Sequence, residues 1–582
     1  MSSPQRAVSA AERRRSAPGP AARRTSLLAA TGAVAMFLVQ PPADLWPLAW
    51  IAPLPWLTLA AAREVPGARP WRTLWLGGFA HWLLAIHWLR LPHPATAIGW
   101  VALSAYLACY VVLFVWTTRR LVHRLTWPLM LAAPVAWMGC EQLRGWVGGG
   151  FSFAGLGHTQ WRWTTLIQAA DAFGAVGVGG VVMAVAAGIA ECAAARTAAR
   201  RLLAAGVTAA VPALALAYGT WRLATVPPPT GRPLDVLLVQ GSIDTELKHD
   251  PAAGGQVARH YDELTLAGLA AGAGTPDLIV WPETMWRWGL ITIDPAEVLP
   301  ETVVVEALGA AAAAALDPAE RQARARRAIE TERLDALAAF ARRYGAAWLV
   351  GLDRQEIAPA APGGARHYNS ALFLDATGAR LGCYDKMHPV LFGERIPCGE
   401  TCPWLYRLTP LPAGLTAGRK PVAVEIAGWH VAANICYETA VPEAVRSLVR
   451  DVAAAGRRPD VLVNLTNDGW FWGSSELDMH LACGIFRAVE VRTPLVIAAN
   501  TGLSAWIDGS GRLLARGPRR DTATLRAAVE PDGRASPWLF WGTVPTGGCV
   551  AVVVAAIAHG LGEWKAGRTP PGDALTGLPI QG

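Results

Sequence analysis

The sequence predicts two structural parts, an α-helical membrane domain of about eight transmembrane helices and a separate α/β domain. The chain has 582 residues, which is enough for more than one domain. Hydrophobic residues make up 53% of it and charged residues 16%, an apolar balance for a soluble protein. The apolar excess lies before residue 225 and after residue 540, whereas 232–535 has the mixed polarity of a water-soluble domain.

Apolar stretches of about 20 residues, the length of a membrane-crossing helix, define the membrane domain. We expect these spans at 25–40, 43–62, 72–90, 96–118, 126–142, 165–190, 202–223 and 540–561. The first span is the weakest, because its apolar stretch is short and Pro41 and Pro42 follow it. The expected division of the chain is a basic tail at 1–24, about seven transmembrane helices at 25–224, the α/β domain at 232–535, and a last helix with a short tail at 536–582.

The distribution of basic residues predicts the orientation, since arginine and lysine gather in cytoplasmic loops. The formal net charge is +8. Many of the basic residues lie at the ends of the apolar runs, in the N-terminal tail, 63–72, 119–124, 196–201 and 565–568. This places the tail and the C-terminus in the cytoplasm and 232–535 on the opposite face. It also explains the positive charge better than nucleic-acid binding, which we do not expect.

The N-terminal segment has a second interpretation. Arg23 and Arg24 followed by an apolar core resemble an export signal peptide. No small-x-small cleavage site follows Val39, and further spans come directly after it. We therefore prefer an uncleaved first helix.

The α/β domain is predicted from short apolar runs that are typical of buried strands. We expect strands at 234–240, 277–281, 347–351, 370–374, 422–426, 431–435, 461–465 and 495–499. The Ala- and Arg-rich stretch 303–345 favours helix. Strands interleaved with helices indicate an α/β or α+β sandwich rather than a barrel of hairpins.

A thiol at the end of one strand is a candidate nucleophile. Cys436 follows strand 431–435 and precedes Pro442, a signal for a helix start. We expect the positive end of that helix to lower the pKa of the thiol and favour the thiolate. The alternative is that Cys436 packs as a small apolar side chain, as most buried cysteines do.

A carboxylate and an ammonium group complete a set that can build and break a thioester. Glu283 comes just past strand 277–281, where open α/β sheets place functional groups, and it could take up the thiol proton. Lys386 could stabilise an oxyanion or lower the thiol pKa. Taken singly, each is more readily an ordinary loop residue, so the hypothesis depends on finding all three with their flanking residues.

Those flanking residues resemble the carbon-nitrogen hydrolase (nitrilase) superfamily. The motifs are WPE around Glu283, YDKMHPVLFGERIP around Lys386 and ICYE around Cys436. The membrane spans, together with NDGWF from Asn467, RAVE from Arg487 and NTGLSA from Asn500, narrow the resemblance to the apolipoprotein N-acyltransferase family.

This resemblance implies a nitrilase-like αββα sandwich on the periplasmic face of an eight-helix anchor in the bacterial inner membrane. It implies acyl transfer from a phospholipid, typically phosphatidylethanolamine, through a cysteine thioester to the α-amino group of the N-terminal diacylglyceryl-cysteine of an apolipoprotein. By carry-over, Cys436 is the nucleophile, Glu283 the general base and Lys386 the stabiliser of the transition state. The supporting residues are Glu394, Tyr437 and Glu438. We expect a monomer with no cofactor and no metal.

Some features depart from the family pattern or stay open. His249 stands where the family usually has tryptophan, and 303–330 is an insertion that we expect to form an extra surface helix. Cys398 and Cys402 either form a disulfide or lie in a turn as free thiols. The segment Phe151–Gln160 either resembles a family loop beside the lipid cleft or is an ordinary interfacial loop.

Two other functions remain as alternatives at this point. A membrane-tethered amidase or nitrilase would use the same three groups with water as the acyl acceptor. A non-catalytic membrane binding protein would keep only the fold. The presence of all three groups argues against the second, and the number of spans argues against the first.

Overall fold

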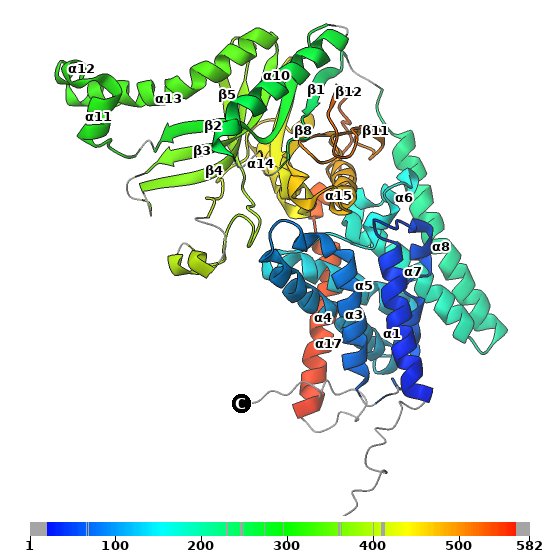
Figure 1. The fold of residues 1–582 in the computed structure, drawn as a ribbon. Helices are drawn as coiled ribbons and strands as arrows, with labels where there is room; N and C mark the ends of the chain where they lie inside the picture. The colour runs from blue at the N-terminus through cyan, green and yellow to red at the C-terminus, as the bar shows by residue number, and fades with distance from the viewer. Residues whose placement is uncertain are drawn as a thin grey trace, which may run out of the picture.

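The computed structural model describes residues 20–565, apart from 66, 68, 229–230, 245–246, 248–249, 273, 295, 359–360, 362–363, 400 and 409–413. The two ends of the chain build a helical part, and the middle builds an α/β part that lies against one end of it (Figure 1). His249, which departs from the family pattern, falls outside the described residues.

Long helices run roughly side by side in the helical part (Figure 1). They are α1 (Pro20–Leu38), α3 (Pro70–Ala85), α4 (Thr96–His123), α5 (Leu129–Trp146), α7 (Ala170–Ala194), α8 (Ala198–Ala224) and α17 (Val544–Lys565), with the short α6 (Thr164–Ile167) and α16 (Pro537–Trp541) beside them. Four helices of the described chain, α4, α7, α8 and α17, are long and apolar enough to cross a membrane. The count of eight spans stays a prediction.

The expected continuous helix at 43–62 is wrong. The structure has the 3₁₀ helix η1 (Trp46–Trp50) and then α2 (Leu54–Ala61), whose eight residues rise only about 12 Å against a hydrocarbon core of about 30 Å. Pro47, Pro53 and Pro55 explain the break, because proline removes a backbone donor and clashes with the preceding turn.

Two six-stranded sheets form the α/β part. The first has the order β12-β1-β2-β3-β4-β5 and the second the order β11-β10-β9-β8-β7-β6. The strands of the first sheet are β1 (Leu234–Gln240), β2 (Leu278–Ile293), β3 (Ala347–Ile357), β4 (Ala365–Leu374), β5 (Arg380–Asp385) and β12 (Ala523–Val529). Those of the second are β6 (Ala423–Ile426), β7 (Trp429–Ile435), β8 (Val461–Thr466), β9 (Leu495–Ala499), β10 (Ala505–Ile507) and β11 (Leu513–Arg516).

Alternating side chains give these sheets two buried faces each. Val236 of β1 and Val431 of β7 belong to one core between the sheets. On its outer face the first sheet buries Trp281 and Trp348 under α10 (Gly254–Ala271) and α13 (Pro318–Tyr344). The second sheet is covered by α14 (Pro442–Ala454) and α15 (Glu476–Val491), and α15 packs on α7 of the helical part. The layers are therefore αββα, and the predicted α/β sandwich is confirmed.

Strand β2 differs from the prediction in a way that matters for the site. We expected it to end at Trp281, but it continues to Ile293, and the pairing with β3 shifts register between Trp281 and Trp286. A bulge of this kind lets a strand carry extra residues without ending. Glu283 thus lies inside β2, at the bulge, and not past a strand end.

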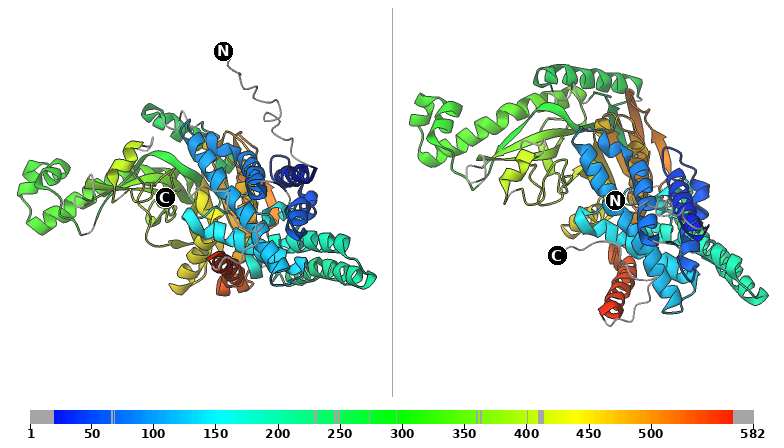
Figure 2. Two further views of the ribbon diagram at one scale, coloured as in Figure 1. Left: turned by 90° about the horizontal axis from the view of Figure 1, so that it is seen from below. Right: turned by 60° about the horizontal axis from the view of Figure 1, so that its bottom comes forward.

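The insertion at 303–330 is part of an arm that projects from the α/β part (Figure 2). Its helices are α11 (Glu301–Leu308), α12 (Ala310–Ala314) and α13. The expected single helix is interrupted at Gly309, whose φ of 79° ends a helix, and restarts at the side-chain cap of Asp317. The arm has a small apolar core of its own, including Ile293 and Val304.

Candidate active site

The structure brings the three chemistry-bearing residues together from both sheets. Glu283 lies at the bulge of β2, Lys386 directly follows β5, and Cys436 follows β7 and opens the 3₁₀ helix η8 (Cys436–Ala440). Lys386 Nζ is 3.5 Å from Glu283 Oε1. The charges of both residues act on the Cys436 thiol. Glu283, Lys386 and Cys436, which were predicted from separate motifs, thus lie together in one site.

Hydrogen bonds fix both oxygens of the Glu283 carboxylate, which is 6% exposed. Asn369 Nδ2 of β4 donates to Oε1 at 2.6 Å, and the backbone N–H of Asn467 donates to Oε2 at 2.9 Å. Sequence reasoning missed both partners, although Asn467 lies in the NDGWF motif that had marked the family. A carboxylate held in this way has a defined position for receiving a proton.

The bulge of β2 at Glu283 lies very close to the backbone of β3 at Gly351. A Cβ built on Gly351 would lie 2.3 Å from the Pro282 carbonyl oxygen and 2.7 Å from Glu283 Cα. Real contacts are never this short, so the neighbouring strand needs glycine at this position. Thr284 adopts φ 55°, a conformation that costs free energy for a β-branched residue. The backbone around Glu283 is therefore held in a strained but defined position.

We expect Gly351→Ala to reduce the rate of covalent reaction at Cys436 by about 100-fold, because displacing a catalytic group by about 1 Å has an effect of this size. The measurement is the single-turnover rate of that reaction, followed by intact mass. Gly428→Ala is the control, because no atom lies within 4 Å of the added Cβ, although its own φ of 84° adds local strain. Equal rates for Gly351→Ala and wild type would contradict the close-approach argument.

Lys386 is buried and paired with two carboxylates. Its Nζ lies 2.8 Å from Glu394 Oε1, and Glu394 Oε2 accepts the backbone N–H of Val390 at 2.7 Å. Burial lowers the pKa of Lys386, but the charges of Glu394 and Glu283 outweigh it and raise the pKa above its ordinary value. The side chain is therefore an ammonium ion at neutral pH, available to stabilise negative charge.

Glu438 joins the loop of Lys386 to the loop of Cys436. Its carboxylate accepts the backbone N–H groups of Met387 at 2.7 Å, His388 at 2.9 Å and Ile435 at 2.7 Å, and the Tyr384 hydroxyl at 2.8 Å. Burial raises its pKa, but hydrogen bonds from the His388 side chain, the Ile435 N–H and the Tyr384 hydroxyl, together with the charge of Lys386, more than offset that effect and the pKa is lowered. Glu438 thus remains a carboxylate that ties two parts of the site.

The Cys436 thiol does not have the lowered pKa that we expected. Burial raises the pKa of the thiol well above its ordinary value, the charge of Glu283 raises it further, and Lys386 opposes this. The expected helix, α14, begins at Pro442, six residues later, and the effect of a helix terminus falls off within one turn. The resting thiol is therefore protonated at neutral pH and needs a base.

Tyr437 connects the nucleophile turn to the helical part. Its hydroxyl donates to the Gly150 carbonyl oxygen at 3.1 Å, and its ring centroid lies 6.0 Å from that of Phe153. Phe153 in turn contacts the ring of Trp88 at 5.4 Å. These rings belong to an apolar cluster shared by the helical part and the neighbours of Cys436. Phe151, Phe153 and Ala154, at the start of the segment Phe151–Gln160, thus form an apolar wall beside the nucleophile turn.

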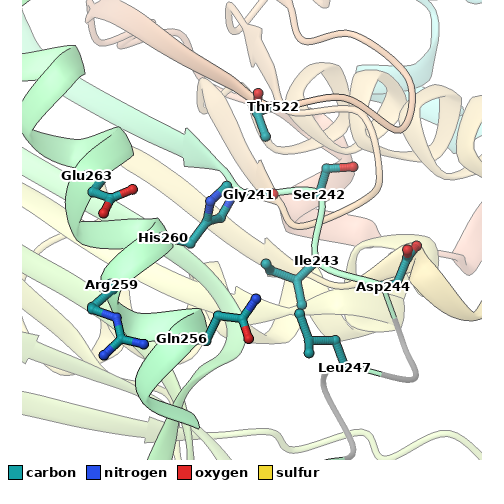
Figure 3. Close-up of a pocket in the computed structure, with 10 residues that line it drawn as sticks. All are labelled: Gly241, Ser242, Ile243, Asp244, Leu247, Gln256, Arg259, His260, Glu263 and Thr522. Atoms are coloured by element: carbon teal, nitrogen blue, oxygen red, sulfur yellow. Dashed lines mark hydrogen bonds between the residues drawn. The ribbon is translucent and has the colours of Figure 1, made fainter. Parts of the chain in front are cut away.

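A solvent-facing pocket of about 480 Å³ lies elsewhere in the α/β part (Figure 3). Figure 3 shows Arg259, His260 and Glu263 of α10 on one side of it and Ile243 on the other. Glu283, Lys386 and Cys436 do not line it. This pocket is separate from the group that we predicted from the motifs.

Two further observations bear on the open predictions. Cys398 and Cys402 are free thiols, and the Cys402 N–H donates to the Cys398 carbonyl oxygen at 2.7 Å, so this segment is a turn without a disulfide. Asp468, Glu476 and His480 are buried, and one potential ligand atom from each lies within 4.8 Å of the others. The sequence showed no spacing that indicated this second cluster.

Comparisons with known proteins match both parts of the chain. The family model of the apolipoprotein N-acyltransferase N-terminal domain matches residues 32–188, and that of carbon-nitrogen hydrolases matches residues 242–536. An apolipoprotein N-acyltransferase of Rhodopirellula baltica is 32% identical over 562 residues, covering 91% of this chain and 96% of that protein. The chain belongs to the apolipoprotein N-acyltransferase family.

Other members and one solved structure are also similar. An apolipoprotein N-acyltransferase of Geobacter metallireducens is 31% identical over 552 residues, with 92% of this chain and 95% of that protein covered. An amidase of the nitrilase superfamily from Nesterenkonia matches 54% of this chain and 95% of its own, at 19% identity and a TM-score of 0.33. The family resemblance drawn from the motifs is confirmed, and with it the prediction of an acyltransferase in a membrane protein.

Proposed function

We propose that this chain transfers a fatty acyl group from a membrane phospholipid, through a thioester on Cys436, to the N-terminal amine of diacylglyceryl-modified apolipoproteins. The observation that carries the proposal is a half-buried thiol that shares its site with one carboxylate and one ammonium ion, next to an apolar wall from the membrane part. Phosphatidylethanolamine is the proposed donor.

In the first half-reaction Glu283 takes the proton of the Cys436 thiol, and the thiolate attacks the ester carbonyl carbon of the phospholipid. The oxygen of the tetrahedral intermediate becomes negative, and the Lys386 ammonium stabilises it. The C–O bond of the ester then breaks, and Glu283 gives its proton to the departing lyso-phospholipid hydroxyl. The acyl group remains on Sγ as a thioester.

In the second half-reaction the neutral α-amine of the acceptor attacks the thioester carbonyl. Glu283 takes the proton that the nitrogen loses as the C–N bond forms. The C–S bond breaks, the new amide leaves, and the thiolate recovers a proton from Glu283. All atoms come from the donor, the acceptor and these side chains, so the two half-reactions need no cofactor.

The thioester must survive until the acceptor arrives. The apolar cluster of Phe153, Tyr437, Trp88 and their neighbours borders the turn that carries Cys436. An apolar surface of this kind excludes water and suits an acyl chain. We propose that the donor lipid approaches along this wall, with Glu394, Tyr437 and Glu438 supporting the site.

Membrane placement follows the same proposal. The start of α1 and the end of α17 lie on the face of the helical part remote from the sheets (Figure 1). Basic residues meet there, since Arg119 donates to the Arg63 carbonyl oxygen and Arg120 pairs with Glu563. By the positive-inside rule this face is cytoplasmic. We propose that 232–535 is periplasmic and that 1–24 is cytoplasmic. We further propose that 25–224 and 536–582 anchor a monomer in the inner membrane by eight passes, of which the broken segment η1–α2 is one.

The test uses two synthetic diacylglyceryl-cysteine peptides, one with a free N-terminal amine and one N-acetylated. With phosphatidylethanolamine and the full chain, we expect the free-amine peptide to gain one acyl group by mass and the acetylated peptide to gain none. Release of free fatty acid with neither peptide modified would instead favour a hydrolase that uses water as acceptor.

A further inference from the structure

The turn that carries the nucleophile is strained. Cys436 has φ 53°, in the left-handed region that costs a residue other than glycine about 1 kcal/mol or more. Such a conformation persists only when surrounding contacts hold it. The contacts that do so determine where the thiol stands.

Two buried side chains bind the Cys436 carbonyl oxygen. Asn464 Nδ2 donates to it at 3.2 Å, and His480 Nε2 lies at 3.2 Å from the same oxygen. Asn464 is itself positioned by a 2.8 Å bond to Asn434 Oδ1. His480 comes from α15, so a helix outside the three-residue group also contacts the nucleophile's backbone.

The partners of His480 define its charge. Its Nδ1 lies 3.3 Å from Asp468 Oδ1, while its Nε2 faces the Cys436 carbonyl. A carbonyl oxygen and a carboxylate only accept hydrogen bonds, so both ring nitrogens carry protons and the ring is an imidazolium. Burial lowers the pKa of His480, but Asp468 outweighs it and the pKa is raised to about 9.

Among the described residues, the charges that act most strongly on His480 are those of Asp468, from the 3₁₀ helix η9 (Asp468–Phe471), and Glu476, from its own helix. From η8 the backbone carbonyl of Cys436 accepts its hydrogen bond. From the helical part Phe153 places its ring 6.5 Å from the imidazole. Burial and the charge of Asp468 raise the pKa of Glu476 well above its ordinary value, so Glu476 is uncharged and Asp468 is the counter-ion.

We propose that the Asp468–His480 pair positions the nucleophile, with the imidazolium holding the Cys436 carbonyl and thereby the left-handed turn that presents the thiol. The inference rests on the proposed function and adds two positioning residues to it. Asp468, Glu476 and His480 also have the composition of a metal site. Because both ring nitrogens of His480 donate hydrogen bonds, neither has a free lone pair for a metal ion. This favours a protonated His480 over a metal-bound one.

The test measures single-turnover thioester formation from phosphatidylethanolamine by the full chain, between pH 6 and pH 10. We expect His480→Gln and Asp468→Asn each to lower the rate 10- to 100-fold, the range for small misplacements. The double variant should be no slower than His480→Gln, because the two residues act as one unit. Asp478→Asn, on the same helix but in an exposed pair with Arg519, is the control.

The pH dependence separates positioning by charge from simple packing. In the wild type the rate should fall above about pH 9, where the imidazolium loses its proton. Asp468→Asn removes the charge that raises this pKa, so the fall should move to lower pH. In His480→Gln this fall should be absent.

Several outcomes would overturn the inference. Additive losses of rate in the double variant would show that Asp468 and His480 act only as packing residues. The same conclusion would follow if the fall in rate at high pH occurred at the same pH in Asp468→Asn as in the wild type. Loss of wild-type activity on chelation, with recovery on adding Zn²⁺, would assign the cluster to a metal. Thermal unfolding of each variant identifies misfolding. A wild type that forms no thioester would instead remove the proposed function itself.

Discussion

Glu283→Gln should slow thioester formation by about 10²- to 10⁴-fold, the range for losing a general base. The reason is the raised pKa of the Cys436 thiol, which leaves the nucleophile protonated at neutral pH. A glutamine keeps the shape of the side chain and part of its hydrogen bonding but cannot accept the proton. The measurement is the single-turnover rate of acylation by intact mass.

The same variant should make the thiol more reactive toward a small alkylating agent. The charge of Glu283 raises the pKa of Cys436, so removing it moves the alkylation curve to lower pH. Slower acylation together with easier alkylation would separate the loss of a base from general damage. Glu263→Gln, in the separate pocket of Figure 3, is the matched control. Unchanged acylation in Glu283→Gln would contradict the assigned role.

Lys386→Met should abolish detectable acylation and destabilise the fold by about 3–5 kcal/mol, the usual cost of removing one partner from a buried ion pair. Lys386 is 1% exposed and lies between Glu394 and Glu283. Without the ammonium ion the buried Glu283 carboxylate and the half-buried Glu394 carboxylate remain with no cation in this group. Equilibrium unfolding in detergent measures the stability, and intact mass measures the acylation.

A paired variant distinguishes the two effects of Lys386. Adding Glu394→Gln to Lys386→Met removes one of the stranded charges, so part of the stability should return while acylation stays absent. Lys420→Met, at an exposed position, is the control. If the paired variant regained acylation, Lys386 would be a structural residue rather than the group that stabilises the oxyanion.

The local sequence pattern was sufficient to predict the strands that consist of one continuous apolar run. Strands β1 and β9 have the predicted bounds, because continuous apolar runs define strands that are buried on both faces. Strands β5, β10, β11 and β12 were missed, because they are short or partly exposed and show no continuous apolar run. The continuous helix predicted at 43–62 is broken in the structure. The prediction followed the apolar character of this stretch and gave too little weight to its three prolines.

The site was predictable in its reactive groups but not in their environment. Glu283, Lys386 and Cys436 carry the reactive functions, and their flanking motifs make them visible in the sequence. Their environment depends on partners brought from other strands, such as Asn369 on β4. The thiol pKa was misjudged for the same reason, since the predicted helix start was local whereas burial and Glu283 act through space.

The most direct measurement is the intact mass of the purified chain after incubation with phosphatidylethanolamine and no acceptor. We predict that the wild type gains one fatty acyl group, that hydroxylamine removes it, and that Cys436→Ala gains none. A well-folded wild-type protein that acquires no acyl group from this phospholipid would contradict the thioester on which the proposed function depends.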